Sequence, residues 1–149
     1  MGRTIKNTIT GKEITKSSPI NEEVPFDGGV MITETDTAGI ITYANRNFRQ
    51  MTGYSKEELI GSSHSINRHP DMPKAAFAGM WEVIKGGNYW EGLVKNMNNE
   101  GKYYLVEVWI KPKFDENNKI IGYIAGRKIP DRDRMNAALE LYKEMVAAE

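Results

Sequence analysis

The chain has 149 residues, which is enough for one domain with a substantial hydrophobic core. Its 20 lysine and arginine residues balance 20 aspartate and glutamate residues, so a general electrostatic attraction to nucleic acid or anionic lipid is not expected. The absence of cysteine excludes disulfides, thiolate metal ligands, cysteine nucleophiles and cysteinyl adducts. No apolar run is long enough to cross a bilayer or to form a secretory signal, and we expect a cytoplasmic protein without direct membrane insertion.

Residues 1–25 are polar, with scattered isoleucines and no sustained hydrophobic period. We interpret them as a flexible N-terminal extension, with room for one short strand or helix that docks on the rest of the chain. The folded domain is therefore expected to begin at about residue 26.

Residues 28–45 contain two β-rich runs on either side of the turn at 36–39, which predicts a hairpin. Asn45 is placed to cap a short helix that ends at Gly53. Ser55 begins a second short helix, because a glutamate follows it at capping-box spacing.

A longer helix is expected before the glycine pair that follows residue 85. Phe77, Met80, Trp81 and Ile84 fall at i, i+3, i+4 and i+7, which places them on one helical face. Aromatic residues at this spacing most often belong to a hydrophobic core.

Three strands separated by turns are expected over 89–97, 102–114 and 119–129, and their lengths suggest an antiparallel meander. Together with the leading hairpin they predict an α+β fold. Its core is a single five-stranded antiparallel sheet, with the short helices covering one face.

Residues 130–149 are expected to form a charged C-terminal helix. Met135, Leu139, Tyr142 and Val146 follow one another at spacings of four, three and four, as in a helix-pairing seam. So short a seam is equally compatible with a helix that packs on its own sheet, and both interpretations stay open.

The two histidines are the only candidates for metal ligation or general-base catalysis. His64 and His69 are five residues apart, which does not place them on one helical face, and Asp71 is the only nearby carboxylate. The sequence has no Gly-x-Ser-x-Gly nucleophile elbow and no phosphate-cradling glycine loop. We therefore expect neither a metal site nor enzymatic turnover.

The segment that precedes the longer helix has both a structural and a functional interpretation. Asp71 can cap the helix and Pro73 suits its first turn, while Arg68 can pair with Asp71 or Glu82. A helix N-terminus beside Arg68 and His69 is also suited to holding a phosphate. The two interpretations are compatible.

Alternation along the strand that begins near Trp90 places Gly92, Val94 and Asn96 on the same face as that tryptophan. If this face is the inner one, the Asn96 amide needs both donor and acceptor partners in the core. A ring with alternating donors and acceptors, such as the uracil edge of a flavin, is one such partner. Gly92 would leave room for it.

Several motifs together resemble the PAS domain family. "TDTAGIITYANRNFRQMTGYSKEELIG" is similar to the opening that PAS domains share widely. "NRHPDMPKAAFAGMW", "YWEGLVKN" and "KYYLVEVWIKP" resemble the PAS domains of bacterial aerotaxis or energy-taxis receptors, which bind FAD. The resemblance covers roughly residues 26–145, and its middle motif is long enough to be specific.

The resemblance implies a redox sensor in which the oxidation state of a bound FAD changes hydrogen bonding in the pocket and moves the sheet and its flanking segments. Arg68, His69 and Asp71 match the motif that the family needs for FAD binding. The other positions that the resemblance assigns to the cofactor are Phe77, Trp81, Trp90, Asn96 and Thr33.

The resemblance also implies a chemotaxis receptor or signalling domain as partner, in cis or in trans, with residues 26–129 as the sensor and 130–149 as a signalling helix. A homodimer is a further option. The chain is then either an excised domain or a free-standing protein that signals to a separate receptor. In either case we expect a cytoplasmic location, with the option of a position beside a membrane-bound receptor. Two alternatives remain: a haem-binding PAS sensor with His64 or His69 as axial ligand, and a cofactor-free PAS module for protein contact or dimerisation.

Overall fold

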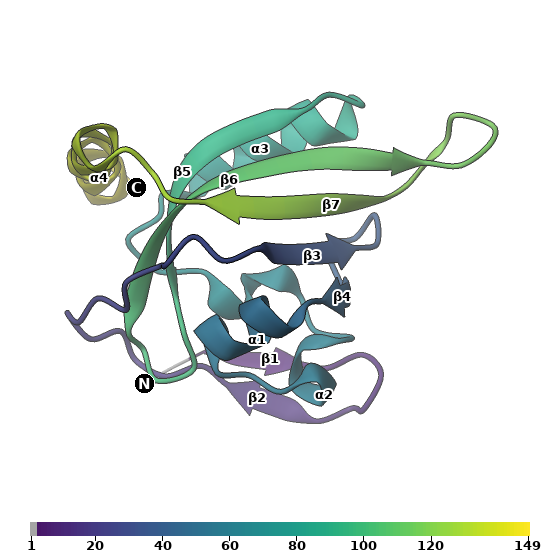
Figure 1. Cartoon of the computed structure of the whole chain (residues 1–149), viewed down its shortest axis with the longest axis horizontal. Coiled ribbons are helices and arrows are strands. Elements are labelled where there is room, and N and C mark those ends of the chain that lie inside the picture. Colours follow the sequence, from purple (N-terminus) through teal and green to yellow (C-terminus); the bar gives the residue numbers. More distant parts are fainter. Residues whose placement is uncertain (1–2) are drawn as a thin grey trace.

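A computed structural model of the protein describes residues 3–149. Five strands form one antiparallel sheet in the order β4-β3-β7-β6-β5 (Figure 1). The predicted five-stranded antiparallel sheet is therefore confirmed. The strands are β3 (Met31–Thr35), β4 (Ile41–Ala44), β5 (Trp90–Met97), β6 (Tyr103–Phe114) and β7 (Ile120–Lys128).

Local capping signals set both ends of α1 and the start of α2 on the inner face of the sheet. The Asn45 side chain accepts a hydrogen bond from the third residue of α1, and Gly53 ends that helix at a positive φ of 76°. Ser55 and Glu58 form the predicted capping box at the start of α2. The helices of this layer are α1 (Arg46–Thr52), α2 (Lys56–Leu59), the 3₁₀-helix η1 (His64–Asn67) and α3 (Lys74–Lys85).

Most of the hydrophobic core lies between this helical layer and the inner face of the sheet. Phe48 of α1, Leu59 of α2 and Ile66 of η1 are fully buried there. Tyr104 and Val106 of β6 face them from the sheet and are also fully buried. The helical layer is thus fixed by α1, α2 and η1, and α3 extends it over the other end of the sheet (Figure 1).

The outer face of the sheet carries α4 (Arg132–Ala147). Met135 is fully buried against Leu93 and Leu105, and the Tyr142 hydroxyl donates a 2.8 Å hydrogen bond to the Leu93 carbonyl. Of the two interpretations left open for the helical seam, the structure has the one in which the helix packs on its own sheet. Among the residues described, no helix is long and apolar enough to cross a membrane.

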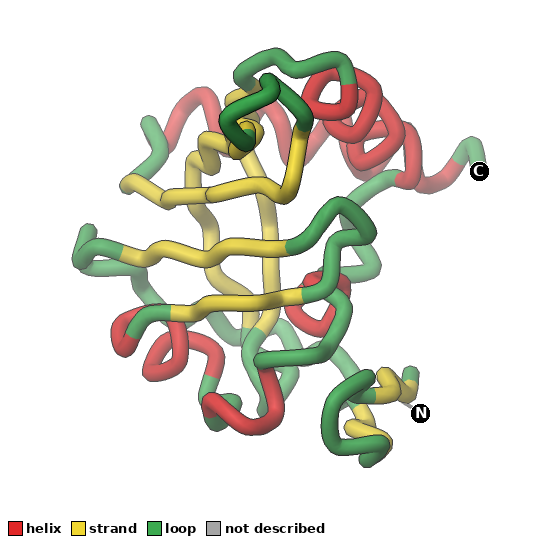
Figure 2. Tube along the Cα trace, turned by 90° about the vertical axis from the view of Figure 1, so that its right-hand side faces the viewer, coloured by secondary structure: helices red, strands yellow, loops and turns green. Residues whose placement is uncertain are grey.

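Residues 3–25 form what we call the N-terminal strap. β1 (Thr4–Lys6) and β2 (Glu13–Thr15) pair as a small antiparallel sheet that lies beside α1 and α2, at the end of the molecule opposite α4 (Figures 1 and 2). Ile5 and Ile14 pack against the main core. The proposed division of the chain after residue 25 and after residue 129 stays a prediction.

Candidate ligand-binding site

A cavity of about 470 Å³ lies between the inner face of the sheet, η1 and α3. Its volume falls in the range of roughly 300–1,000 Å³ that is common for small-molecule and cofactor sites. Among its lining residues, hydrogen bonds join Thr33, His64, Asn67 and Arg127 into what we call the polar end. The Trp81 and Tyr123 rings contact each other and mark what we call the apolar end. Such a division suits a ligand that has a polar edge and a flat apolar body.

A chain of hydrogen bonds organises the polar end. Arg127 of β7 donates to Thr33 Oγ1 at 2.8 Å and from its second terminal nitrogen to His64 Nε2 at 3.0 Å. Because a guanidinium can only donate, Nε2 of His64 is the acceptor, and the neutral ring carries its proton on Nδ1. That nitrogen lies 3.3 Å from Asn67 Oδ1, and the Asn67 amide donates in turn to the Tyr104 hydroxyl at 3.0 Å.

The electrostatics of this end are set by one buried cation. Burial lowers the pKa of Arg127 to about 10, so the side chain remains charged near neutral pH. Burial, followed by the charge of Arg127, lowers the pKa of His64 to about 4 and keeps the ring neutral. Among residues 3–149, no carboxylate pairs with Arg127, and its buried Nε lacks a hydrogen-bond partner. A negatively charged or acceptor-rich ligand would satisfy both needs.

The apolar end is closed by aromatic rings. Trp81 of α3 and Tyr123 of β7 meet edge to face, with ring centroids 5.6 Å apart. Trp81 also reaches the turn between β3 and β4, where a Cβ on Gly39 would lie 3.1 Å from the indole. Near the polar end, the Arg68 guanidinium stacks on Phe77 at 4.1 Å from the ring centroid.

The structure brings six of the eight sequence-predicted site residues to this cavity and leaves two outside its lining. His69 and Asp71 lie outside, in the loop that joins η1 to α3. The six that line the cavity are Thr33, Arg68, Phe77, Trp81, Trp90 and Asn96.

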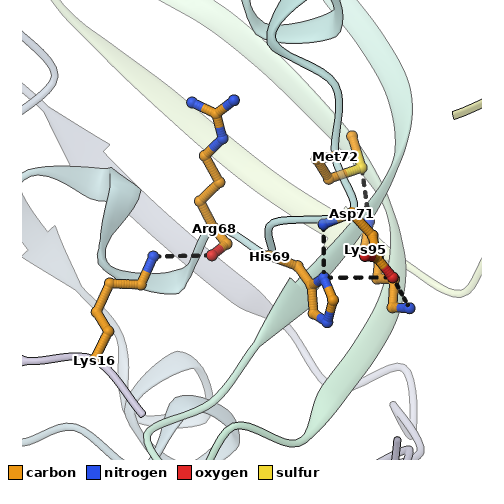
Figure 3. A network of polar contacts seen from close by, with 6 residues as sticks. All are labelled: Lys16, Arg68, His69, Asp71, Met72 and Lys95. Atoms are coloured by element: carbon orange, nitrogen blue, oxygen red, sulfur yellow. Dashed lines mark hydrogen bonds and ion pairs between the residues drawn. The ribbon is translucent and has the colours of Figure 1, made fainter. Parts of the chain in front are cut away.

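His69 and Asp71 fasten their loop to the edge of β5 (Figure 3). His69 is 4% exposed, and its Nδ1 accepts a 3.0 Å hydrogen bond from the Asp71 backbone. The Asp71 carboxylate pairs with Lys95 of β5 at 2.8 Å, and the Lys95 backbone amide donates to the Met72 sulfur. The Arg68 side chain points away from this cluster. The loop thereby holds Arg68 and Asn96 opposite each other in a bridge between their backbones.

The charge state of this loop follows from its surroundings. Burial, followed by the charge of Lys95, lowers the pKa of His69 to about 4, which keeps its ring neutral. Partial burial acts to raise the pKa of Asp71, but the hydrogen bond from Lys95 and the nearby positive charge together outweigh it and hold the pKa below its ordinary value. At neutral pH the ion pair between Asp71 and Lys95 is therefore formed.

Two local expectations were wrong. Asp71 does not cap α3: the N-cap is Pro73, and the Lys74 amide is instead satisfied by the Glu149 carboxylate at 2.7 Å, because Asp71 turns towards Lys95. Gly92 does not leave room for a ligand ring either. The indole of Trp90 lies over it, so that a Cβ at position 92 would be 2.3 Å from that ring.

Three comparisons identify the fold family. A sequence model described as PAS fold matches residues 41–125. The chain belongs to the PAS family. The aerotaxis receptor of Escherichia coli (strain K12) is 41% identical over 121 residues, which are 81% of this chain and 24% of the receptor. The predicted resemblance to a PAS domain of the aerotaxis-receptor type is thereby confirmed.

Two further relatives are regulatory or light-sensing proteins by name. The nitrogen fixation regulatory protein of Klebsiella pneumoniae is 30% identical over 64% of this chain and 19% of its own length. The blue-light photoreceptor of Listeria innocua serovar 6a is 30% identical over 78% of this chain and 46% of its own length. This PAS domain thus spans less than half of each of these relatives.

Solved structures agree on the fold. The light state of the blue-light photoreceptor Aureochrome1 LOV superposes with a TM-score of 0.66 at 19% identity, over 74% of this chain and 89% of that one. A light-oxygen-voltage domain studied with a flavin analogue gives a TM-score of 0.64 at 18% identity, over 79% and 88% of the two chains. At these identities the likeness shows the PAS fold alone.

The sequence reasoning missed three residues of the polar end. Arg127, His64 and Asn67 line the cavity, and the sequence drew attention only to His64, as a candidate metal ligand, general base or haem ligand. A usable signal existed for Arg127, because it shares its strand face with Tyr123 and Ala125, which also line the cavity. No comparable signal marks Asn67, since a short 3₁₀-helix has no reliable sequence pattern.

Proposed function

We propose that this PAS domain binds FAD in the cavity and senses its redox state for aerotaxis or energy taxis, without turnover of its own. The observation that carries the proposal is the buried, charged Arg127 beside the cavity, with an Nε that has no partner among the described residues. The 41% identity to an aerotaxis receptor and the fold shared with a domain studied with a flavin analogue support a flavin as the ligand.

The chemistry of the cavity fits a flavin. Asn96 presents an amide, Thr33 a hydroxyl and Arg127 an Nε without a partner, so the polar end offers both donors and acceptors. The Asn67 amide is already engaged by His64 and Tyr104 and lines the same end. Trp81 and Trp90 provide apolar surface for a flat ring. We assign ring binding to these residues, together with Phe77 and the missed Arg127 and His64.

When bound, FAD would supply a redox centre that gains electrons and protons on reduction. The fixed charge of Arg127 would favour the form with more negative charge. The neutral His64 holds Arg127 in place as an acceptor, and its proton on Nδ1 fixes the orientation of the Asn67 amide. Asn96 can respond by turning its amide, because the side chain lies in the cavity wall.

We assign His69 and Asp71 a positioning role in FAD binding. Both lie outside the cavity lining, and they anchor the loop that carries Arg68 and precedes α3. Loss of either side chain would displace cavity walls that other residues form. Arg68 itself lines the cavity and is the member of the motif that we expect to touch the cofactor.

β5 offers a path from the cavity to the C-terminal helix. Asn96 lies on its inner face, whereas Leu93 lies on its outer face in contact with Met135 and with the Tyr142 hydroxyl. A shift of β5 that follows from flavin reduction would therefore change how α4 packs against the outer face of the sheet. We propose that α4 passes this change to a chemotaxis signalling partner, in cis or in trans.

The haem alternative is disfavoured by the state of the histidines. Both ring nitrogens of His64 already have hydrogen-bond partners, and His69 lies outside the cavity lining.

An absorption spectrum of the purified protein, before and after incubation with FAD and removal of free ligand, tests the proposal. We expect flavin bands in the blue and near-ultraviolet at close to one FAD per chain, and weaker retention of FMN. A Soret band would replace the proposal with the haem alternative. A featureless spectrum after incubation would leave the cofactor-free contact module.

A further inference from the structure

The Lys16 side chain of the N-terminal strap does not line the cavity, but it contacts the backbone of η1, which forms part of the cavity wall. Its Nζ donates to the Ser65 carbonyl at 2.8 Å and to the Arg68 carbonyl at 2.9 Å (Figure 3 shows the second of these contacts). The Ser65 carbonyl also accepts the hydrogen bond from the Arg68 amide that closes the last turn of η1, and the second carbonyl belongs to the C-cap residue itself. Lys16 therefore caps, from a distant part of the sequence, the segment that carries four cavity residues: His64, Ser65, Asn67 and Arg68.

A second anchor of the strap lies just ahead of η1. Asn7 is fully buried, and its amide nitrogen lies within 3.2 Å of the Glu57 and Glu58 carbonyls and 2.8 Å from that of Ile60. These carbonyls end α2, and the chain runs directly from them into η1. The strap thus contacts segment 60–68, which contains η1, at both of its ends: Asn7 at the start and Lys16 at the end.

Burying the Lys16 ammonium costs free energy, and its hydrogen bonds to the η1 backbone offset part of that cost. Lysine side chains are rarely buried without a carboxylate partner, because the ammonium loses its hydration. Lys16 is 7% exposed, and among residues 3–149 no carboxylate pairs with it. Burial, followed by the charges of Arg3 and Arg68, lowers its pKa to about 8. The two carbonyls are the only hydrogen-bond partners of its ammonium group in the described chain.

We infer that the N-terminal strap is part of the ligand-binding unit, and that Lys16 is a positioning residue that sets the geometry of Arg68 and of the η1 wall. The inference rests on the proposed function for the identity of the ligand. Its structural half concerns η1 alone and can be tested without any ligand.

The test compares three variants of the full chain: Lys16→Met, Lys16→Arg and, as matched control, Lys12→Met, an exposed lysine of the same strap. Hydrogen exchange is followed at the Ile66 and Arg68 amides, which close the turns of η1. We expect Lys16→Met to accelerate exchange at these amides at least tenfold and to weaken FAD binding about tenfold. Lys16→Arg should restore both in part, and Lys12→Met should change neither.

Global stability separates positioning from a general structural role. Lys16→Met removes the cost of burying an ammonium but leaves the Ser65 and Arg68 carbonyls without that donor. Because these two effects oppose each other, the urea midpoint should change little while FAD affinity falls. Should Lys16→Met fail to fold, Lys16→Gln takes its place.

Unchanged exchange at η1, or unchanged FAD affinity with faster exchange, would overturn the inference. If the unaltered chain binds no FAD at all, the proposed function fails. The inference is then decided by exchange at η1 alone.

Discussion

Arg127 and the two histidines show how single side chains set the charge of the interior. Arg127 is a buried cation held by neutral acceptors, and His64 is one of them because its ring stays unprotonated. His69 is also neutral, and its Nδ1 accepts from the Asp71 backbone amide. Protonation of either ring would place a second positive charge next to Arg127 or Lys95.

The lowered histidine pKa values predict acid sensitivity. Each pKa falls from 6.5 to about 4 on folding, so between these values the unfolded chain binds more protons and stability decreases as the pH falls. From pH 7 to pH 5 we expect His69 to contribute a loss of about 2 kcal/mol. Urea unfolding at the two pH values measures it. In His69→Asn, which keeps an acceptor for the Asp71 amide, the loss should be smaller by about that amount; an equal loss in both proteins would contradict the assignment.

The ion pair between Asp71 and Lys95 is predicted to matter for the ligand more than for folding. The Asp71 side chain is 62% exposed, and exposed ion pairs contribute only about 0–1 kcal/mol. Asp71→Asn should therefore shift the free energy of unfolding by less than about 1 kcal/mol and still weaken FAD binding by roughly tenfold.

The matched control for the Asp71→Asn prediction is an ion pair of β5, the strand that carries Lys95. Glu91 of β5 pairs with Lys128 at 2.9 Å on the outer face, away from the cavity. Glu91→Gln should leave FAD affinity unchanged. If both variants lose affinity equally, the loop that carries Asp71 has no special role.

Among the secondary-structure elements, the C-terminal helix α4 is predicted to be a stabilising part of the domain. It packs on the outer face of the sheet through Met135, whereas Leu141 on the other side of the helix is 55% exposed. Met135→Ala should lower the free energy of unfolding by about 2–5 kcal/mol because it leaves a cavity beneath the helix. Leu141→Ala should stay within about 0.5 kcal/mol. Urea unfolding followed by circular dichroism distinguishes them, and similar effects would contradict the packing seen here.

How far the elements can be predicted from sequence depends on whether their cause is local. The caps at Asn45 and Ser55 were predicted because a side chain reaches a backbone amide three residues away. For the strap, the sequence indicated only room for one short strand or helix, without bounds, because its two strands are three residues long and carry no period. The direction of Asp71 was mistaken because Lys95, its partner, is 24 residues away.

At the scale of the whole molecule, the cavity is built by parts of the chain that no short motif joins. α3 and η1 form one wall, β3, β5, β6 and β7 form the other, and the strap supports η1 from behind. The family resemblance identified the fold and the residues on β5 and α3. It did not indicate Arg127 or Lys16, because each acts through a contact with a segment far away in the sequence.

The central claim is that a fixed positive charge beside the cavity responds to the redox state of a bound flavin. A spectroelectrochemical titration of the FAD-loaded chain and of Arg127→Met measures it directly, with Lys111→Met, an exposed lysine of β6, as control. We expect the midpoint potential to be lower in Arg127→Met than in the unaltered chain, because the reduced and more negative flavin loses its neighbouring cation, and to be unchanged in Lys111→Met. Equal midpoint potentials in all three proteins, or no flavin bands in the unaltered one, would contradict the claim.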